Sequence, residues 1–331
     1  MVAHSVSMIG GGSWATALVK VLTENNHSVH WWARSVRIIA HLQSSHHNPD
    51  YISSVNFSPD LIHASNDLEK VFARNEIIVL AVPSAYLKMV LTRLSPDLLK
   101  NKIIISAIKG MVPQENLLIA EYLQKAFAVE EKNIVNISGP SHAEEVAQEK
   151  LSYLTLAGVS EKNAMLACEL LSCKYIRCTA SDDVYGTEYS AVLKNIYAIT
   201  AGIFHGLGYG DNFHAVLISN CIEEMERFLK MVHPITRDIK DSAYLGDLLV
   251  TAYSKFSRNR TLGTMIGKGY SVKNALLEMN MVAEGFFAAK CIYEVNRNFG
   301  VRIPIAEETY RVLHDNGNAS DKMRKITGLI S

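Results

Sequence analysis

A short apolar segment near the start of the chain runs directly into three consecutive glycines and then into a helical pattern. Residues 5–9 read as a strand, and residues 13–19 as the opening of a helix. Between them, Gly10 permits a tight turn and Gly12 lets the backbone approach phosphates, while Ala15 allows close packing of helix on strand. The positive end of the helix dipole would face the anion. The arrangement predicts a pyrophosphate-binding turn; the alternative is a glycine turn that binds no ligand.

Further apolar strands alternate with helical segments as far as about residue 180. The expected strands are residues 28–32, 76–82, 102–106, 133–137 and 151–156, with a helix from Tyr86 to Leu94. Strands that alternate with helices favour a largely parallel sheet covered on both faces. We therefore expect a doubly wound α/β domain of the Rossmann type, with ligands at the carboxyl ends of its strands.

The pattern changes after Asp182, where long helical segments replace the strands. Residues 190–207, 212–232 and 278–299 each have helical periodicity, and Gly300 is a plausible stop for the last of them. The sequence thus predicts a dinucleotide-binding domain over residues 1–183 and an all-helical substrate-binding and catalytic domain over residues 184–331.

Composition excludes several classes of protein. Lys and Arg together number 33, as do Asp and Glu, so no basic excess is present to neutralise a nucleic-acid backbone. We expect neither a secretory leader nor a membrane span, because the glycines interrupt the early apolar stretch and no apolar run is long enough. The five cysteines are odd in number and lack metal-ligand spacing. They favour a reducing compartment, and we expect a cytoplasmic protein that holds no metal.

Three loops follow consecutive strands of the first half and would meet at one edge of the sheet. They are Val82 to Ser84, Ser106 to Gly110 and Ser138 to Glu145. The second places Lys109 beside a glycine, and the third enters a helix whose free N–H groups could hold an anion. Each loop alone has an ordinary structural interpretation, whereas their shared position favours a site.

Two charged residues of the helical half stand in apolar surroundings. Lys194 interrupts an apolar helical run, and Asp247 lies in Leu-Gly-Asp-Leu-Leu. A buried lysine needs a partner or a lowered pKa, and Asp247 is a natural partner. Desolvation would bring the lysine pKa toward the range useful for proton transfer. The alternative is a lysine that extends from the helix edge to water.

A basic side chain further along is suited to a phosphate group. Arg258 stands between Ser257 and Asn259, and a guanidinium offers paired donors to two oxygens. The alternatives are a helix cap for Ser257 and a solvated charged turn for the other residues.

Taken together, these motifs resemble the soluble NAD(P)-dependent glycerol-3-phosphate dehydrogenases over essentially the full length of the chain. The matching segments, in order, are residues 10–18, 82–84, 108–110, 139–145, 193–195, 201–202, 206–212, 246–247, 257–259, 284–285 and 304–305. Ala15 stands where the family usually has glycine, Asn220 where many members have arginine, and Tyr189 where a smaller aliphatic residue is usual.

The resemblance implies reversible reduction of dihydroxyacetone phosphate to sn-glycerol 3-phosphate, which supplies a phospholipid precursor, by a homodimer. It implies that Lys194 is the general acid/base, that Asp247 holds it, and that Arg258 is the phosphate clamp. The implied substrate-binding residues are Lys109, Gly139, Ser141, Lys194, Asp247, Ser257, Arg258 and Asn259. The implied cofactor-binding residues are Gly10, Gly12, Ser13, Trp14, Arg34, Lys109, Ala143, Arg258, Val282 and Glu284.

Either NAD or NADP could be the cofactor. The second strand is followed by Arg34 and Ser35 instead of an acidic residue, which favours NADPH because both could receive a 2′-phosphate. Arg34 could equally stack on adenine. Two alternative functions are a related β-hydroxyacid or sugar-acid dehydrogenase and a non-catalytic dinucleotide-sensing protein. The motifs around Asp247 and Arg258 argue against both.

Overall fold

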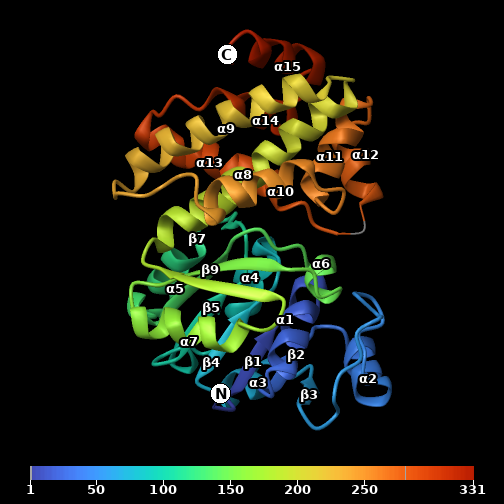
Figure 1. Cartoon of the computed structure of the whole chain (residues 1–331), viewed down its shortest axis with the longest axis vertical. Helices are drawn as coiled ribbons and strands as arrows, with labels where there is room; N and C mark the ends of the chain where they lie inside the picture. The colour runs from blue at the N-terminus through green and yellow to red at the C-terminus, as the bar shows by residue number, and fades with distance from the viewer. Residues whose placement is uncertain (1, 280) are drawn as a thin grey trace. The chain divides into compact units, whose positions relative to one another are not determined.

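The computed structural model describes residues 2–279 and 281–331, which pack as two units (Figure 1). The first unit comprises residues 1–108 and 119–184, and the second comprises residues 109–118 and 185–331. The domain boundary between residues 183 and 184 remains our proposal. The sequence prediction divides the chain at one point only, whereas residues 109–118, which lie within the predicted first domain, pack with the helical unit.

The first unit is built on a sheet of eight strands in the order β10-β9-β8-β5-β4-β1-β2-β3. All neighbouring strands are parallel except β8 and β9, which are antiparallel. The α/β fold expected from the sequence is thus confirmed. The strands are β1 (Ser5–Ile9), β2 (Ser28–Trp32), β3 (Ile62–Ser65), β4 (Ile77–Leu80), β5 (Ile103–Ser106), β8 (Ile134–Ser138), β9 (Ser152–Ala157) and β10 (Ile176–Ser181).

Helices cover this sheet, as parallel strands require. They are α1 (Ser13–Glu24), α2 (Val36–Ser45), α3 (Leu68–Arg74), α4 (Ser84–Leu91), α5 (Ile119–Phe127), α6 (Ala143–Ala147) and α7 (Glu161–Leu171), with 3₁₀ turns η1 (Pro96–Leu98) and η2 (Glu131–Asn133). Central strands such as β4 are buried along their length, which explains their continuous apolar sequences. Strands β3 and β10 have no counterpart in the sequence prediction, because these edge strands are partly exposed and lack an apolar run.

Among the described residues of 185–331, every regular element of the second unit is a helix. Its helices are α8 (Val184–Gly206), α9 (Asp211–Val232), α10 (Asp247–Tyr253), α11 (Arg258–Gly267), α12 (Val272–Glu278), α13 (Glu284–Phe299), α14 (Pro304–His314) and α15 (Ala319–Thr327), with a π turn η3 (Ser242–Gly246). A small antiparallel hairpin, β6 (Met111–Val112) with β7 (Leu117–Leu118), packs with them. Gly300 ends α13 in the left-handed conformation, as the sequence predicts.

Helices α8 and α11 cross closely because glycines line their contact. A Cβ atom at Gly263 of α11 would lie 2.0 Å from the carbonyl oxygen of Ile199, and one at Gly202 of α8 would lie 2.2 Å from the carbonyl oxygen of Arg260. The two backbones therefore approach more closely than any side chain would allow. This contact packs α11 against the last two turns of α8, directly after the part of α8 that carries Lys194 and Asn195.

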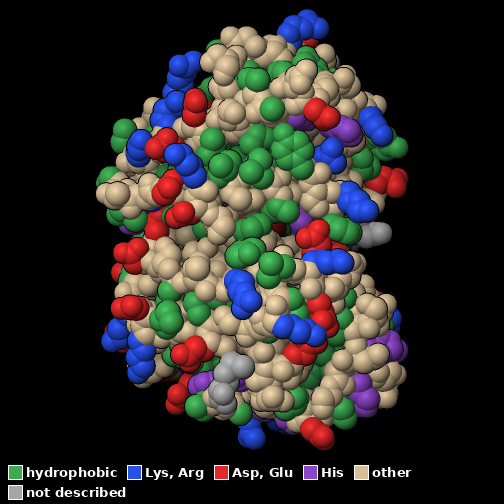
Figure 2. Space-filling model, viewed as in Figure 1, with side chains coloured by type: hydrophobic (Ala, Val, Ile, Leu, Met, Phe, Trp, Pro, Cys, Tyr) green, Lys and Arg blue, Asp and Glu red, His purple; other side chains and the backbone are tan. Residues whose placement is uncertain are grey.

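Acidic and basic side chains are intermingled on the face that Figure 2 displays, in keeping with the equal numbers of the two kinds. Among the described residues, no helix is both long and apolar enough to cross a bilayer.

Candidate functional site

The glycine-rich turn of the first unit has the geometry of an anion cradle. Gly10 has a φ of +136°, and a Cβ there would lie 2.3 Å from the carbonyl oxygen of Ala81. A side chain at Gly10 is therefore excluded. A Cβ at Gly12 would have no neighbour within 4 Å, so the space beside this residue is open. The turn thus combines a strained position that requires glycine with an open position where a ligand could approach.

Helix α1 begins immediately after this turn. Gly12 is its N-cap residue and provides no side chain to cap it. The next two residues, Ser13 and Trp14, lie in its first turn, and the buried indole N–H of Trp14 has no hydrogen-bond partner among the described residues. A dinucleotide fits this cradle, because its pyrophosphate would accept from the N–H groups at the start of the helix.

The other candidate residues of this unit follow the carboxyl ends of its strands. Arg34 is exposed after β2, and Ser35 caps α2 by accepting from the backbone N–H of Ile38. Gly139 follows β8 with a φ of +97°, and Ser141 donates to its carbonyl oxygen at 3.0 Å. Ala143 is the buried first residue of α6. These positions agree with the rule that parallel sheets bind ligands at the carboxyl ends of their strands.

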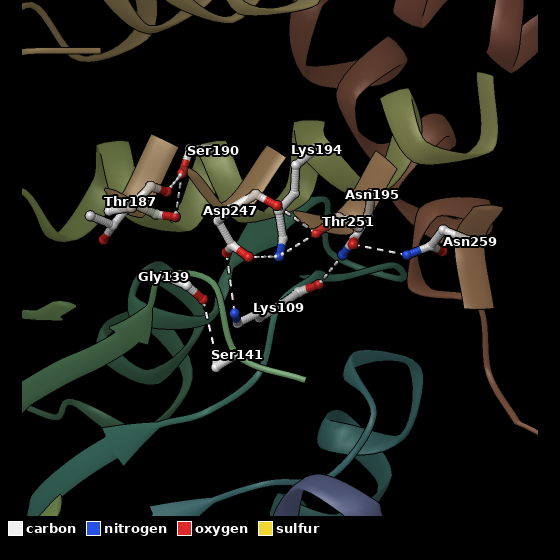
Figure 3. Close-up of polar contacts among 11 residues, drawn as sticks. Lys109, Gly139, Ser141, Thr187, Ser190, Lys194, Asn195, Asp247, Thr251 and Asn259 are labelled. Atoms are coloured by element: carbon white, nitrogen blue, oxygen red, sulfur yellow. Dashed lines mark hydrogen bonds and ion pairs between the residues drawn. The ribbon is translucent and has the colours of Figure 1, made fainter. Parts of the chain in front are cut away.

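In the second unit, Lys194 and Asp247 form a buried ion pair, as the sequence predicts (Figure 3). The Lys194 Nζ atom lies 2.5 Å from Asp247 Oδ1 and 3.1 Å from the hydroxyl of Thr251. The side chains of the lysine and the aspartate are 5% and 1% exposed. The alternative of a lysine that extends to water is therefore wrong for Lys194.

A second lysine shares the same carboxylate. Lys109 Nζ donates to Asp247 Oδ2 at 3.1 Å, so each carboxylate oxygen receives one ammonium group. Burial lowers the pKa of Lys194 to about 7; the charge of Lys109 acts in the same direction, and that of Asp247 opposes it. Burial alone would raise the pKa of Asp247, but the two ammonium groups hold it below its usual range. The cluster can therefore exchange a proton at Lys194 near neutral pH while Asp247 stays ionised.

Local backbone structure places Asp247 at this point. It begins α10 directly after the π turn Ser242–Gly246, and π turns frequently occur at functional sites. Ser190 of α8 donates to the carbonyl oxygen of Ala243 at 3.0 Å, which fastens the π turn to the helix that carries Lys194. Thr251 lies four residues after Asp247 on the same helix face and donates to its carbonyl oxygen at 2.6 Å.

A chain of amide hydrogen bonds runs beside the ion pair. Asn195 donates to the carbonyl oxygen of Lys109 at 2.8 Å and accepts from Asn259 at 2.8 Å. The Oδ1 atom of Asn259 in turn accepts from the backbone N–H of Gly285 at 2.9 Å. The chain links the Lys109 segment, α8, α11 and the start of α13, and Figure 3 shows its part from Lys109 through Asn195 to Asn259.

The remaining candidates lie at the starts of α11 and α13. Ser257 caps α11 by accepting from the backbone N–H of Arg260, so the helix-cap interpretation of Ser257 is confirmed. Arg258, the first residue of α11, is half-buried. Val282 and Glu284 are also half-buried, and Glu284 is the first residue of α13. The structure thus places Lys109, Lys194, Asp247 and the start of α11 in the helical unit, and the glycine turn with Arg34, Gly139, Ser141 and Ala143 in the sheet unit.

Three interactions of the site are not part of the sequence prediction, although Lys109 itself is a predicted site residue. Thr251 binds Lys194, Asn195 organises the Lys109 segment, and Lys109 itself pairs with Asp247. The spacing of four residues from Asp247 to Thr251 is a signal that could have identified the threonine. No signal in the sequence joins Lys109 to Asp247.

A dinucleotide cradle on a parallel sheet, together with a helical unit that buries a lysine of near-neutral pKa, defines a nicotinamide-dependent dehydrogenase of two-domain type. Residues 5–164 match the model of the NAD-dependent glycerol-3-phosphate dehydrogenase N-terminus, and residues 183–324 match that of its C-terminus. The chain belongs to the NAD-dependent glycerol-3-phosphate dehydrogenase family.

Individual relatives agree with this assignment. The chain is 36% identical over 311 residues to the glycerol-3-phosphate dehydrogenase [NAD(P)+] of Bacillus subtilis, covering 93% of this chain and 89% of that one. It is 34% identical to the enzyme of the same name from Syntrophotalea carbinolica, covering 97% of both. The crystal structure of glycerol-3-phosphate dehydrogenase from Coxiella burnetii superposes with a TM-score of 0.91 at 28% identity, covering 98% of this chain and 99% of that one.

More distant dehydrogenases share the fold alone. The structure of D-mandelate dehydrogenase with NADH has a TM-score of 0.60 at 14% identity, covering 94% of this chain and 98% of that one. The alternative of a β-hydroxyacid or sugar-acid dehydrogenase is therefore not favoured, because the family models and the relatives at 34–36% identity all carry the glycerol-3-phosphate name.

Proposed function

We propose that this chain catalyses the reversible, NAD(P)H-dependent reduction of dihydroxyacetone phosphate to sn-glycerol 3-phosphate. The observation that carries the proposal is the buried ammonium group of Lys194, fixed by Asp247 and Thr251, in a member of this family. A non-catalytic dinucleotide sensor would have no need of a buried lysine whose pKa lies near 7.

Lys194 supplies the proton of the reaction. The reduced nicotinamide, when bound, supplies the hydride that converts the ketone carbon to a secondary alcohol. Lys194 donates its proton to the oxygen on which negative charge develops, and it accepts a proton in the reverse reaction. Asp247 and Thr251 keep Nζ in place, and Asp247 stabilises the protonated form.

Arg258 is the proposed clamp for the substrate phosphate, with Ser257 and Asn259 beside it. A half-buried guanidinium forms stronger hydrogen bonds to phosphate than an exposed one, because less water competes. Ser257 and Asn259 also hold the helix start and the amide chain, so they would orient Arg258 as well as contact the substrate. Lys109, Gly139 and Ser141 are the other proposed substrate contacts.

The proposed dinucleotide ligands are the glycine turn and the residues that the resemblance implies. Gly10, Gly12, Ser13 and Trp14 would hold the pyrophosphate region, and Lys109, Ala143, Arg258, Val282 and Glu284 would contact other parts of the cofactor. Arg34 favours NADPH, because its exposed guanidinium beside the N-cap of α2 is suited to a 2′-phosphate.

Cofactor preference is tested with Arg34→Ala. The variant should weaken NADPH binding far more than NADH binding, measured as separate dissociation constants. Equal losses for the two cofactors would reject the 2′-phosphate role and favour stacking on adenine.

The reaction itself is tested with purified protein, NADPH or NADH and dihydroxyacetone phosphate, followed by loss of nicotinamide absorbance. Lys194→Ala should lower kcat by about 10²–10⁴-fold and leave cofactor affinity nearly unchanged. The matched control is Lys20→Ala, another buried lysine bound to carboxylates, which belongs to the sheet unit. Turnover by Lys194→Ala close to that of Lys20→Ala would exclude the proton-transfer role.

The phosphate clamp is tested with Arg258→Ala, which should lower kcat/KM for dihydroxyacetone phosphate by about 100-fold or more. Arg260→Ala on the same helix is the control and should have a small effect. Unphosphorylated dihydroxyacetone should be a poor substrate for the wild type and for Arg258→Ala alike. If the wild type reduces both ketones equally well, the clamp is misassigned.

We also propose that the protein is a cytoplasmic homodimer that operates mainly in the reducing direction to supply a glycerophospholipid precursor. Light scattering coupled to size-exclusion chromatography tests the dimer.

A further inference from the structure

The carbonyl oxygens of the three glycines in the turn are each held by a different side chain. Trp31 donates from its indole to Gly10 at 2.6 Å, Asn48 donates to Gly11 at 3.1 Å, and Thr16 donates to Gly12 at 2.9 Å. Glycine is otherwise the most flexible residue of a chain. The turn is therefore fixed from outside by these three side chains.

Of these three side chains, only that of Asn48 comes from an irregular loop, the one after α2, and Asn48 belongs to none of the sequence motifs described above. It is completely buried, and all its hydrogen-bonding capacity is used. Its Nδ2 group donates to Gly11 O and to Thr16 Oγ1, at 3.1 and 2.9 Å. Its Oδ1 accepts from the backbone N–H groups of Asp50 and Tyr51, at 3.1 and 3.3 Å. If the amide were rotated by 180°, its oxygen would face the carbonyl oxygen of Gly11, which cannot donate a hydrogen bond. The hydrogen bonds therefore determine the orientation of the amide, with Nδ2 toward Gly11.

The bond to Gly11 has a consequence for the next residue. A trans peptide is planar, and its C=O and N–H groups point in opposite directions. When Asn48 holds the carbonyl of Gly11, it therefore also fixes the direction of the Gly12 N–H group, away from Asn48. Gly12 is the N-cap of α1 and the position with open space beside it.

We propose that Asn48 is a positioning residue for the cofactor, which orients the Gly12 amide toward the pyrophosphate through the carbonyl of Gly11. The inference rests on the proposed use of a dinucleotide. An oriented amide binds more tightly than a mobile one, because the cost of ordering it is met during folding and not during binding. Asn48 touches neither the substrate nor the reacting atoms, so its effect should appear in cofactor affinity and much less in kcat.

The first test is Asn48→Ala, with Asn25→Ala as a matched control. Asn25 is also a buried amide of the sheet unit, and its Nδ2 donates to the carbonyl oxygens of Leu170 and Ser172 at 2.9 and 3.0 Å. Asn25 lies at the opposite end of α1 from the glycine turn. Both variants lose two donated bonds, so both should lose stability, whereas only Asn48→Ala should lose cofactor affinity.

Binding is measured by calorimetry with ADP-ribose, which contains the pyrophosphate, and with adenosine 2′-monophosphate, which does not. Asn48→Ala should raise the dissociation constant for ADP-ribose and the KM for NADPH about tenfold, with adenosine 2′-monophosphate affinity and kcat within about twofold of wild type. An unchanged ADP-ribose affinity, or an equal loss in Asn25→Ala, would overturn the proposal.

If Asn48→Ala does not fold, Asn48→Asp replaces it. Aspartate keeps an oxygen for the N–H groups of residues 50 and 51 but cannot donate to Gly11. Salt screens a buried charge only weakly, so the affinity for adenosine 2′-monophosphate, which is also anionic, measures the effect of the added charge. A loss of ADP-ribose affinity well beyond the loss for adenosine 2′-monophosphate supports the proposal, and equal losses or no loss contradict it. ADP-ribose binding requires no turnover, so a wild type that binds it but fails to reduce dihydroxyacetone phosphate would refute the proposed reaction alone.

Discussion

Lys109 and Lys194 donate to opposite oxygens of Asp247, at 3.1 and 2.5 Å, so one carboxylate lies between two ammonium groups. The three residues come from the segment after β5, from the middle of α8 and from the start of α10. Lys109 therefore acts on the proton chemistry of Lys194, with which it shares the carboxylate of Asp247. Its positive charge makes a second positive charge nearby less favourable.

The first prediction concerns Lys109→Met. Removing this positive charge should raise the pKa of Lys194 above about 7, because a group that lowers it is lost. In the reducing direction Lys194 must be protonated, so activity falls as pH rises through its pKa. The alkaline limb of the kcat/KM profile should thus move to higher pH in the variant, in addition to any loss of substrate affinity.

The control for Lys109→Met is Lys255→Met, because Lys255 is an exposed lysine of the same unit. An alkaline limb of Lys109→Met that stays in place or moves to lower pH would contradict the argument.

The pairing of Lys194 with Asp247 could be predicted from the sequence, because each stands alone as a charge among apolar residues. Burial of one charge requires the other, whatever the details of the fold. The part played by Lys109 could not be predicted, since it depends on how residues 109–118 leave the sheet and pack with the helices. The hairpin that they form is too short to give a pattern.

The same distinction holds in the sheet unit. Strand β1 and helix α1 begin close to the predicted positions, since the glycine turn fixes the boundary between them. The hydrogen bond from Asn48 to this turn could not be predicted from the sequence. Asn48 lies in an irregular loop, where no periodic pattern indicates which residue its side-chain amide contacts. Tertiary hydrogen bonds of this kind become visible only in the folded chain.

A second prediction separates stability from cofactor binding at the glycine turn. Gly12 has a φ of −85°, and a Cβ there would meet no atom within 4 Å, so Gly12→Ala should lower the free energy of unfolding by no more than about 1 kcal/mol, the cost of alanine at an N-cap. The added methyl group would occupy space that the pyrophosphate needs, and the dissociation constant for NADPH should rise at least about tenfold. Gly10→Ala should instead lower stability itself, because of its positive φ and the contact with Ala81. Normal NADPH affinity in Gly12→Ala would place the phosphates elsewhere.

A third prediction tests the crossing of α8 and α11. Alanine normally stabilises a helix relative to glycine, by up to about 1 kcal/mol. Gly263→Ala should do the reverse and lower the free energy of unfolding by about 2 kcal/mol or more, because its Cβ would lie 2.0 Å from the carbonyl oxygen of Ile199. Gly328→Ala is the control, since its Cβ would lie 3.6 Å from its nearest neighbour, the carbonyl oxygen of Lys325, which is ordinary van der Waals contact. Equal melting temperatures for the two variants would show that the helices can separate without cost.

The last prediction uses a buried carboxyl group remote in sequence from the lysines. Glu224 of α9 accepts from the backbone N–H groups of Ile305 and Ala306, both at 2.9 Å, and so caps the start of α14. Burial nevertheless raises the pKa of Glu224 to about 7. Between its ordinary pKa of about 4.5 and this value, the folded protein retains a proton that the unfolded chain has released. The contribution of Glu224 to stability therefore falls as pH rises through this window, by about 3 kcal/mol in total.

Glu224→Gln removes this titration and should be destabilised by loss of one accepted bond, since a glutamine side chain has a single oxygen. The difference in free energy of unfolding, wild type minus variant, should decrease steadily from about pH 4.5 to about pH 7 and then level off. Urea unfolding across this range measures it, and the remaining titratable groups cancel in the difference. Glu226→Gln, an ion-paired residue nearer the surface of the same helix, should give a difference without this slope. A constant difference for Glu224→Gln would mean that the carboxylate is ionised throughout, held by the N–H groups at the start of α14 in spite of its burial.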